Sequence, residues 1–472
     1  MSIQPSTQPS THSSSPTYDR VVVAGGSVAG LLAAAALAPL SREVVVLERD
    51  DVARHVGVRP GTPQAGQVHG LLASGRLAME ELLPGFTDAL LAGGAISRGD
   101  IGSNGRWWIG GGLLADTEVG ANGVAASRSL IERTVRGLAI RLPQVVVRDR
   151  VDVQGLVTDG SGRVVTGVRL RDRATDGPAE ELAADLVVDA TGRSARSVRW
   201  LAALGMAEPP LERVRVGVRY ATTHVERRDG DLGGRSVCVS AAVPRVPRVG
   251  VAIAQEDDTW VIGVCGYDEE QPPVDADGFR HYAAGVVAPE VAELLAGRAL
   301  LHPPVTYRFP DCRRRRFDKV DLPRGFAAVG DAVTSVDPAF GQGMSLAALQ
   351  AVALRRRAGR GLEDVRRRHA VDAAAVAERA WTVVVGADLN LPGVEGARPP
   401  GHGAVSRYVA RAQRVARRDP VVARTLMRVT NLLEPPTALM RPRIALRVAA
   451  GGAASASVLR VTPRSPTRRT PC

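Results

Sequence analysis

Residues 20–30 read RVVVAGGSVAG, a run of β-branched residues followed at once by a glycine-rich turn. The valines predict a short buried strand over 20–24, and the alanine-rich segment 28–38 predicts a helix. The segment EVVVLERD at 43–50 predicts the next parallel strand, which completes a βαβ unit of about thirty residues. A βαβ unit with a glycine-rich first turn is typical of a dinucleotide-binding domain.

The turn matches the glycine spacing of a dinucleotide site at two positions and departs from it at a third. Gly25 stands where the chain turns tightly and Gly30 where the helix packs on the strand, with Gly26 adding freedom between them. Ser27 takes the place of the glycine that lets the backbone approach the pyrophosphate. We expect this small side chain to be tolerated, with its hydroxyl as a further donor at the helix N-terminus. Glu48, at the end of the second strand, is expected to accept hydrogen bonds from an adenosine ribose.

A second motif, GDAVTSVDPAFGQGMSLAALQ, lies far along the chain at 330–350. Asp331 follows a predicted buried strand and is placed to accept hydrogen bonds from the hydroxyls of a ribityl chain. After Pro338, Gly341 and Gly343 open a predicted helix, whose N–H groups can face the negative edge of a flavin ring. A nicotinamide cofactor has no need of this second motif, so the two motifs together predict FAD.

Composition and charge exclude several other classes of protein. The chain has 472 residues and a net charge of +12, which comes almost entirely from arginine, since Lys319 is the sole lysine. No basic stripe interleaved with aromatic residues and no zinc-finger spacing is present, so no nucleic-acid partner is predicted. The four cysteines form no CxxC pair, which predicts neither a disulfide framework nor a thiolate metal site and indicates a cytoplasmic location. The uncharged run 21–40 divides at its glycines and at Pro39, and therefore predicts a strand, a turn and a helix rather than a membrane span.

The remaining segments complete the prediction of an α/β fold. We expect a discontinuous, Rossmann-like FAD-binding domain, a mainly antiparallel β-sheet substrate lobe and a C-terminal helical extension. A hairpin signal lies at DGSG (159–162), and alternating apolar residues run through 213–310. The expected parts are a disordered tail at 1–18, the FAD-binding domain at 19–75, 124–200 and 311–357, the substrate lobe at 76–123 and 201–310, the helical region at 358–451 and a flexible tail at 452–472.

In order and spacing, four segments resemble those of FAD-dependent monooxygenases of the para-hydroxybenzoate hydroxylase type. They are the two motifs above together with ASRSLIERTV (126–135) and ADLVVDATGRSARS (184–197), so that the resemblance spans residues 19–357. The stretches RPGTPQAGQVHGLLASGRLAMEELLPGF (59–86) and LPGVEGARPP (391–400) also resemble actinobacterial enzymes related to the epoxidases of polyether polyketide assembly. The resemblance implies that NAD(P)H reduces the flavin, and that a C4a-hydroperoxyflavin delivers one oxygen atom of O2 to a hydrophobic small molecule.

The same resemblance implies that Arg59, Arg128 and Asp331 contact FAD. With the motif residues, the expected cofactor-binding set is Gly25, Gly26, Ser27, Ala29, Gly30, Glu48, Arg49, Arg59, Arg128, Asp331, Pro338, Gly341, Gly343 and Met344. The flavin carries the chemistry, so no catalytic nucleophile is expected. His69 is the candidate for a further catalytic role, and Tyr220 and Trp260 are candidates for the substrate pocket.

The chain departs from the family pattern at Thr191-Gly192, where aromatic hydroxylases of this type carry Asp-Gly in a stretch linked to FAD and NAD(P)H binding. The departure leaves open whether NAD(P)H reduces the flavin directly or a separate flavin reductase does.

Several activities are compatible with these motifs. Epoxidation of an alkene in a polyketide or isoprenoid intermediate of natural-product (antibiotic) biosynthesis is favoured, because it asks only for orientation over the flavin. An aromatic hydroxylase, which needs a base or a hydrogen-bond network, is one alternative, and a flavin-dependent reductase or dehydrogenase of an isoprenoid substrate is another. A flavin halogenase is disfavoured, since Trp107 and Trp108 are adjacent rather than spaced. The basic helices predicted at 408–433 are expected to pack on the FAD-binding domain, with peripheral membrane contact as the alternative.

Overall fold

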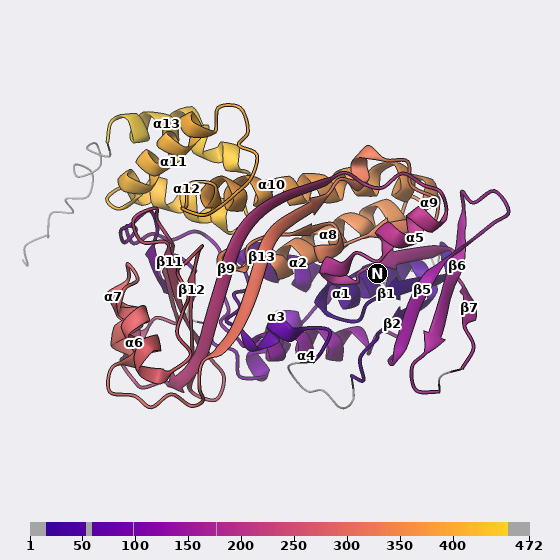
Figure 1. The fold of residues 1–472 in the computed structure, drawn as a ribbon, viewed down its shortest axis with the longest axis horizontal. Coiled ribbons are helices and arrows are strands. Elements are labelled where there is room, and N and C mark those ends of the chain that lie inside the picture. Colours follow the sequence, from indigo (N-terminus) through magenta and orange to yellow (C-terminus); the bar gives the residue numbers. More distant parts are fainter. Residues whose placement is uncertain (1–15, 53–58, 98, 176, 452–472) are drawn as a thin grey trace, which may run out of the picture.

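The computed structural model describes residues 16–52, 59–97, 99–175 and 177–451. These residues form three β-sheets with helices on several sides, and the last helices gather at one end of the molecule (Figure 1). The expected tail at 452–472 and most of the tail at 1–18 lie outside the described residues.

A parallel five-stranded sheet forms around the first motif. Its strand order is β14-β8-β1-β2-β4, and each pair of neighbours runs parallel. The strands are β1 (Tyr18–Ala24), β2 (Ser41–Leu47), β4 (Val145–Arg148), β8 (Leu186–Asp189) and β14 (Phe326–Ala328). Both faces of the central strand β1 are covered, which explains why its sequence is continuously apolar instead of alternating. The predicted Rossmann-like core is confirmed.

One face of this sheet is covered by α1 (Val28–Leu37) and α8 (Gly343–Ala358), which come from distant parts of the chain. A second group of helices packs around these two in a shared core: α2 (Ala73–Leu82), α3 (Phe86–Ala92) and α4 (Arg128–Ala139). Helix α1 is enclosed between the sheet and the other helices, so its alanines and leucines are buried almost all round. Helices α2 and α3 belong to the segment 76–123 that was expected in the substrate lobe. For these two helices the expectation is corrected, because the buried side chains Met79 and Phe86 join the core formed with α1, α4 and α8. Residues 105–108 of the same segment do pair with the antiparallel sheet.

The second sheet has seven strands in the order β15-β13-β9-β12-β11-β10-β3 and is antiparallel apart from the pairing of β10 with β3. Its strands are β3 (Gly105–Trp108), β9 (Leu211–Glu226), β10 (Val237–Ser240), β11 (Arg248–Gln255), β12 (Thr259–Gly266), β13 (Val305–Arg315) and β15 (Thr334–Ser335). The long paired strands β9 and β13 run side by side from this sheet toward the parallel sheet (Figure 1). The outer face is covered by α6 (Ala276–Ala284) and α7 (Pro289–Leu295), two helices that the alternating sequence did not predict.

A third sheet covers the remaining face of the parallel sheet. It consists of β5 (Val151–Thr158), β6 (Val165–Asp172) and β7 (Glu180–Ala183), and the predicted DGSG turn joins β5 to β6. Its buried valines and leucines form one core with the side chains of β1 and β2 that point to this face.

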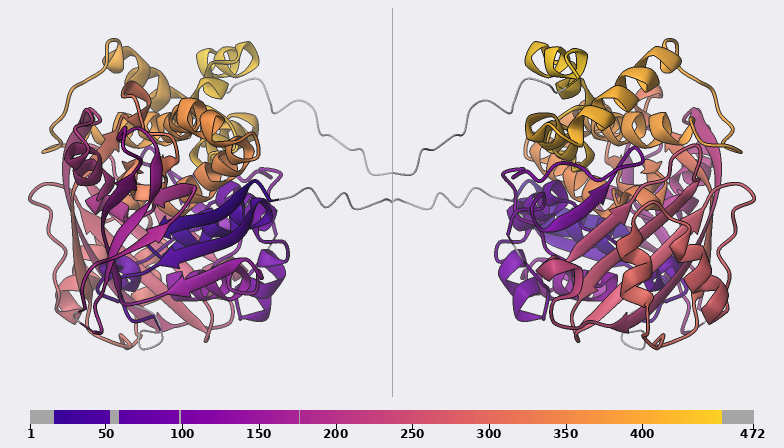
Figure 2. Two further views of the ribbon diagram at one scale, coloured as in Figure 1. Left: turned by 90° about the vertical axis from the view of Figure 1, so that its right-hand side faces the viewer. Right: turned by 90° about the vertical axis from the view of Figure 1, so that its left-hand side faces the viewer.

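The C-terminal part of the described chain is helical, as predicted. It contains α9 (Leu362–Asp364), α10 (Ala370–Asp388), α11 (His402–Ala416), α12 (Pro420–Thr430) and α13 (Pro442–Ala449). Helices α11 to α13 form a layer of their own at the top of both views in Figure 2. The apolar sides of α11 and α12 are buried against one another and against Ile101 and Leu114. Among the described helices, none combines the length and the apolar composition needed to cross a bilayer.

Candidate functional site

The carboxyl ends of β1, β2, β8 and β14 meet at one edge of the parallel sheet, where open α/β sheets bind their ligands. The glycine-rich turn leaves β1 at this edge. Gly25 has a φ of +108°, and a Cβ there would lie 2.4 Å from the carbonyl oxygen of Ala190. A Cβ on Gly30 would lie 1.7 Å from the carbonyl oxygen of Gly25. The backbone of the turn therefore requires glycine at both positions.

Ser27 is the N-cap residue of α1, but its side chain accepts no hydrogen bond from the first turn of that helix. The hydroxyl is turned toward α4, where it accepts a hydrogen bond from Nη2 of Arg128 at 3.1 Å and donates one to Glu132 at 3.3 Å. The first N–H groups of α1 are thereby left without a side-chain cap, which is the state of a helix N-terminus that binds an anion. This geometry fits a pyrophosphate group.

Glu132 is a site residue that the sequence analysis did not single out. It lies one turn after Arg128 and one turn before Arg136 on α4, and it pairs with them at 2.6 and 3.2 Å. It also accepts a hydrogen bond from Arg59 at 2.9 Å. Burial opposes ionisation of Glu132, but the charges of Arg128 and Arg59 outweigh burial and lower its pKa. The spacing of opposite charges at i, i+4 and i+8 is the signal that points to this residue.

Glu48 and Arg59 meet just beyond the end of β2. Oε2 of Glu48 accepts the N–H of Gly26 at 2.8 Å and lies 2.9 Å from Nη1 of Arg59. Its other oxygen, Oε1, accepts the N–H of Asp50 at 3.0 Å and keeps lone pairs for a further donor. Burial lowers the pKa of Arg59, but the carboxylates of Glu48 and Glu132 reverse this effect and raise it.

Arg49, which was also expected at the site, is exposed, and its guanidinium lies 3.7 Å from Asp50. Its guanidinium is therefore placed outside the buried cluster of Glu48, Arg59 and Glu132.

The two sequence motifs meet through Gly330 and Ala29. Gly330 has a φ of +67°, and a Cβ there would lie 2.8 Å from the Cβ of Ala29 in the first turn of α1. This close packing places Asp331, half-buried, beside the glycine-rich turn. Burial raises the pKa of Asp331, and the charges of Arg193, Arg315 and Arg128 act in the opposite direction.

The loop after Asp331 leads into the N-terminus of α8, a helix of 16 residues. Pro338 is exposed, and Gly341 has a φ of +65°, a conformation that favours glycine. Among the described residues, nothing lies within 4 Å of the position a Cβ on Gly343 would take. The open helix N-terminus at Gly343 and the half-buried Met344 fit the edge of a ring that carries negative charge.

His69 lies in the loop 67–70, which runs beside Gly341. The Cβ position of Gly341 is 3.7 Å from the carbonyl oxygen of Gly70. Nδ1 of His69 lies 2.8 Å from the carbonyl oxygen of Gln67, so we assign the ring proton to Nδ1 and leave Nε2 as an acceptor. Burial, reinforced by the charge of Arg128, lowers the pKa of His69 to about 4. His69 is therefore neutral at neutral pH.

The same loop forms a wall against the inner face of the seven-stranded sheet. Gln67 accepts a hydrogen bond from the hydroxyl of Thr222 at 2.8 Å and donates one to the carbonyl oxygen of Val305 at 3.1 Å. Val68 packs with four side chains of the inner face, Val237, Val251, Ile253 and Val261, and with Ile96, which lies outside the sheet. Apart from the hydrogen-bonded pair of Gln67 and Thr222, the side chains at this wall are apolar.

Of the two candidates for the substrate pocket, Trp260 lies on the outer face of the seven-stranded sheet, and for this residue the expectation is corrected. Trp260 is buried under α6 and α7 and donates its indole N–H to Asp231 at 2.9 Å. Adjacent residues of a strand point to opposite faces, so Trp260 faces outward where Val261 faces the loop 67–70. Tyr220 is on the inner face, but it is buried and its hydroxyl is fully engaged with Asp337 at 2.6 Å.

Arg193, next to the unusual Thr191-Gly192, is a second residue that the sequence analysis missed. It donates to Asp311 at 3.0 Å and to the hydroxyl of Ser335 at 2.7 Å, and its guanidinium stacks 4.4 Å from the ring of Phe309. These contacts hold the positive charge of Arg193 close to Asp331, where the parallel sheet and the seven-stranded sheet meet. No sequence pattern around Arg193 predicts this position, because its partners come from β13 and β15.

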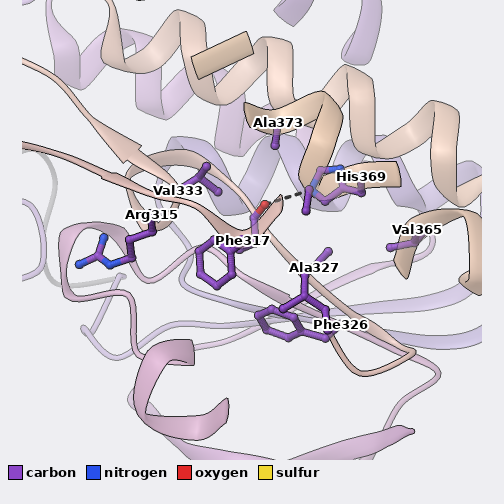
Figure 3. A pocket seen from close by; sticks show the side chains of 11 residues that line it. Arg315, Phe317, Phe326, Ala327, Val333, Val365, His369 and Ala373 are labelled. Carbon is purple, nitrogen blue, oxygen red and sulfur yellow. Dashed lines mark hydrogen bonds between the residues drawn. The ribbon is translucent and has the colours of Figure 1, made fainter. Parts of the chain in front are cut away.

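A small cavity lies away from these loops, in the core between the parallel sheet and α10 (Figure 3). His369 donates a hydrogen bond from Nε2 to the carbonyl oxygen of Ala328 at 3.0 Å beside it, and Phe317 and Phe326 face it. Its lining is mostly hydrophobic core, and it belongs to the interior. Within the described part of the chain, no group of three or more His, Cys, Asp or Glu side chains is arranged to hold a metal ion.

The fold is that of flavoproteins and flavin-dependent monooxygenases. A flavoprotein/dehydrogenase from Cytophaga hutchinsonii matches 92% of this chain and 96% of its own with a TM-score of 0.63 and 17% identity. The flavin-dependent brominase Bmp2 matches with a TM-score of 0.63 and 14% identity, covering 92% of this chain and 97% of its own. The p-nitrophenol 4-monooxygenase PnpA from Pseudomonas putida DLL-E4 has a TM-score of 0.60 and 17% identity, and the match covers 88% of this chain and 99% of PnpA.

At the level of sequence, no family model matches the chain. It is 34% identical over 351 residues to Protein Rv3254 of Mycobacterium tuberculosis, and the match covers 72% of each chain. The chain belongs to the same family as Protein Rv3254.

Proposed function

We propose that the protein is an FAD-dependent monooxygenase that inserts one oxygen atom of O2 into a hydrophobic small molecule, with NAD(P)H as the source of electrons. The contact between Gly330 and Ala29 carries this proposal, because it joins a phosphate-binding turn to a second loop with an acidic residue and an open helix N-terminus. A nicotinamide dinucleotide would use the first of these elements alone, whereas FAD would use both.

The residues at this edge of the sheet fit FAD. The uncapped N-terminus of α1 and Arg128 would hold the pyrophosphate, and the remaining lone pairs of Glu48 would take a ribose hydroxyl. Asp331 would accept hydrogen bonds from the ribityl chain, and the N–H groups from Gly341 to Met344 would face the ring. Bound in this way, the flavin would supply the activation of O2 and the transfer of one oxygen atom. The protein's part is to orient the substrate and to exclude water.

Beside the loop 67–70, the inner face of the sheet carries mostly apolar side chains, and we take this surrounding as support for an apolar substrate. Within that class we propose an alkene of a polyketide or isoprenoid intermediate, which would be epoxidised. His69 is the titratable side chain of the loop beside Gly341, and with a pKa of about 4 it is too weak a base to ionise a phenol. This property favours epoxidation over aromatic hydroxylation.

Flavin-dependent dehydrogenation or reduction of an isoprenoid is the second candidate function. It draws support from the flavoprotein/dehydrogenase among the proteins of the same fold, and from the absence of the family's Asp-Gly at Thr191-Gly192. That departure also leaves room for a separate flavin reductase in place of direct reduction by NAD(P)H.

The test is a set of reactions with purified protein reconstituted with FAD. Reduced by NADH, NADPH or an added flavin reductase, the protein is mixed with ¹⁸O2 and with an apolar alkene or a matched phenol, and the products are analysed by mass spectrometry. We expect one ¹⁸O atom in an epoxide from the alkene. Saturation or desaturation without ¹⁸O would replace the proposal by the dehydrogenase, and hydroxylation of the phenol alone would replace epoxidation by hydroxylation.

A further inference from the structure

A buried acidic cluster lies directly behind the loop that carries Gly341. Asp337 and Asp388 are both fully buried, at 0% exposure, although they lie on different elements, the loop before α8 and the end of α10. The cluster also contains Tyr220 of β9 and Tyr267, which directly follows β12. The mechanism proposed above uses none of these four side chains.

In its hydrogen bonds, the side chain of Asp337 acts only as an acceptor. Oδ1 accepts the hydroxyl of Tyr220 at 2.6 Å and the N–H of Ala339 at 2.9 Å, and Oδ2 accepts the hydroxyl of Tyr267 at 2.6 Å. A carboxylate accepts three such bonds without conflict, whereas a carboxylic acid would bring a proton of its own into this ring of donors. Asp337 is therefore the ionised member of the cluster.

The phenol of Tyr267 lies between the two carboxyl groups and has one proton to give. Its oxygen is 2.6 Å from Oδ2 of Asp337 and 3.5 Å from Oδ1 of Asp388, so the proton belongs to the shorter contact. The phenol oxygen then presents a lone pair to Asp388. An ionised Asp388 would repel this lone pair and would add a second negative charge to the cluster. A protonated Asp388 turns its own O–H toward that lone pair.

Among the residues that the structure describes, no cation lies directly against the two carboxyl groups to offset a second negative charge. The titratable groups that face the two carboxyl groups within the described chain are Tyr220, Tyr267, Cys265 and Cys312, with Arg193 beyond Cys312. Burial raises the pKa of both carboxyl groups. The hydrogen bonds from Tyr220 and Tyr267 act against burial at Asp337, whereas the neighbouring charge of Asp337 raises the pKa of Asp388 further, well above its ordinary value. Burial also raises the pKa of both tyrosines, which keeps them as donors.

We propose that Asp337 and Asp388 form a carboxyl pair that holds one negative charge and one proton, and that Asp337 is the positioning residue of the cofactor loop. Hydrogen bonds from Tyr220 and Tyr267 connect Asp337 to the seven-stranded sheet. Asp337 in turn holds the loop before α8 by accepting the N–H of Ala339. The pair thus locks the N-terminus of α8 to the sheet that forms the substrate wall. A negative charge behind the loop also opposes the charge that a flavin gains on reduction, and this part of the inference rests on the proposed function.

Infrared difference spectra of the protein without added flavin test the proton assignment. At pH 8, wild type minus Asp388→Asn is expected to contain the C=O band of a protonated carboxylic acid. Wild type minus Asp337→Asn is expected to contain carboxylate bands. If Asp337→Asn does not fold, Tyr220→Phe takes its place, and the spectrum of that variant is expected to retain the acid band. Asp419→Asn is the matched control, because Asp419 is equally buried but is paired with Arg447 at 2.8 Å. Absence of the acid band in the first difference, or its assignment to Asp337, overturns the proposal.

The reduction potential of the bound flavin tests the positioning role. Asp337→Asn is expected to favour two-electron reduction by at least tenfold, about 30 mV, whereas Asp388→Asn leaves the charge unchanged and shifts the potential by less. Equal potentials in the wild type and Asp337→Asn would refute the link to the cofactor. Failure to bind any flavin would refute the proposed function alone, since the infrared result does not depend on it.

Discussion

The hydroxyl of Ser27 lies 3.1 Å from a guanidinium nitrogen of Arg128, so the glycine-rich turn is hydrogen-bonded to α4. The side chain that breaks the glycine pattern points to α4 and leaves the helix N-terminus uncapped. In the proposed FAD site, Ser27 would therefore have a role of its own, since it orients the arginine expected to meet the pyrophosphate.

Substitutions at Ser27 test this role. We expect Ser27→Gly to leave FAD affinity within a few-fold of wild type, since Arg128 keeps its partner Glu132. Ser27→Val is expected to weaken FAD binding about tenfold, which corresponds to about 1.4 kcal/mol, because a branched apolar side chain crowds the phosphates and Arg128. Fluorescence titration of the apoprotein with FAD measures both. Equal affinities for the valine variant and the parent would contradict this account of the turn.

Two glycines that differ in their surroundings provide a matched pair. Gly30→Ala places a Cβ 1.7 Å from a backbone oxygen and is expected to lower the free energy of unfolding by about 1–3 kcal/mol, with or without flavin. Gly343→Ala adds a Cβ in open space at the start of α8, so we expect the stability of the apoprotein to be unchanged or slightly higher. The affinity for FAD should nevertheless fall in Gly343→Ala, if the ring edge lies there. Urea unfolding and FAD titration separate the two effects, and a Gly343→Ala protein with unaltered FAD affinity would argue against the placement of the ring.

Glu132 balances the charges of Arg59 and Arg128 in the apoprotein. Glu132→Gln is expected to cost about 3 kcal/mol of unfolding free energy, because it leaves buried guanidinium groups without their counter-charge. Bound FAD brings negative phosphates to the same place, so we expect FAD to raise the melting temperature more in the variant than in wild type. Differential scanning calorimetry with and without FAD gives this comparison. A smaller rise in the variant would mean that Glu132 does not face the phosphates.

The lowered pKa of His69 predicts a defined dependence of stability on pH. The unfolded chain binds a proton at His69 near the ordinary value of 6.5, and the folded chain only near 4. Stability should therefore rise with pH between about 4 and 6.5, with a slope of up to about 1.4 kcal/mol per pH unit from this residue. In His69→Gln that contribution to the slope disappears, while the contributions of other groups stay. Urea unfolding at several pH values between 4 and 7 measures the difference, and identical slopes would show that His69 is protonated normally in the folded protein.

The sequence predicts those parts of the molecule that depend on local order. The strand, turn and helix at 20–38 carry their own signals, namely β-branched residues, spaced glycines and an alanine-rich run, and the structure follows them. The site at the edge of the sheet was predictable as far as its motifs extend, and Glu132 was within reach of helical spacing.

The pair Asp337 and Asp388 shows where such prediction ends. An aspartate in a loop and another at the end of an alanine-rich helix look like solvent-facing residues, and their burial depends on β9 and β12 folding over them. Trp260 gave the opposite error, because the sequence does not say which face of the sheet α6 and α7 will cover. Both cases depend on contacts between segments that are distant in the sequence, and such contacts produce no periodic pattern of apolar residues from which they could be predicted.

The central claim is that two distant motifs build one FAD site, and a comparison of flavins tests it most directly. The apoprotein is titrated with FAD and with FMN, and binding is followed by flavin fluorescence and absorbance. We predict one FAD bound per chain, with FMN bound far more weakly, because FMN lacks the adenosine end that Glu48 and the turn at Gly25 would hold. No binding of FAD, or equal binding of FAD and FMN, would contradict the account.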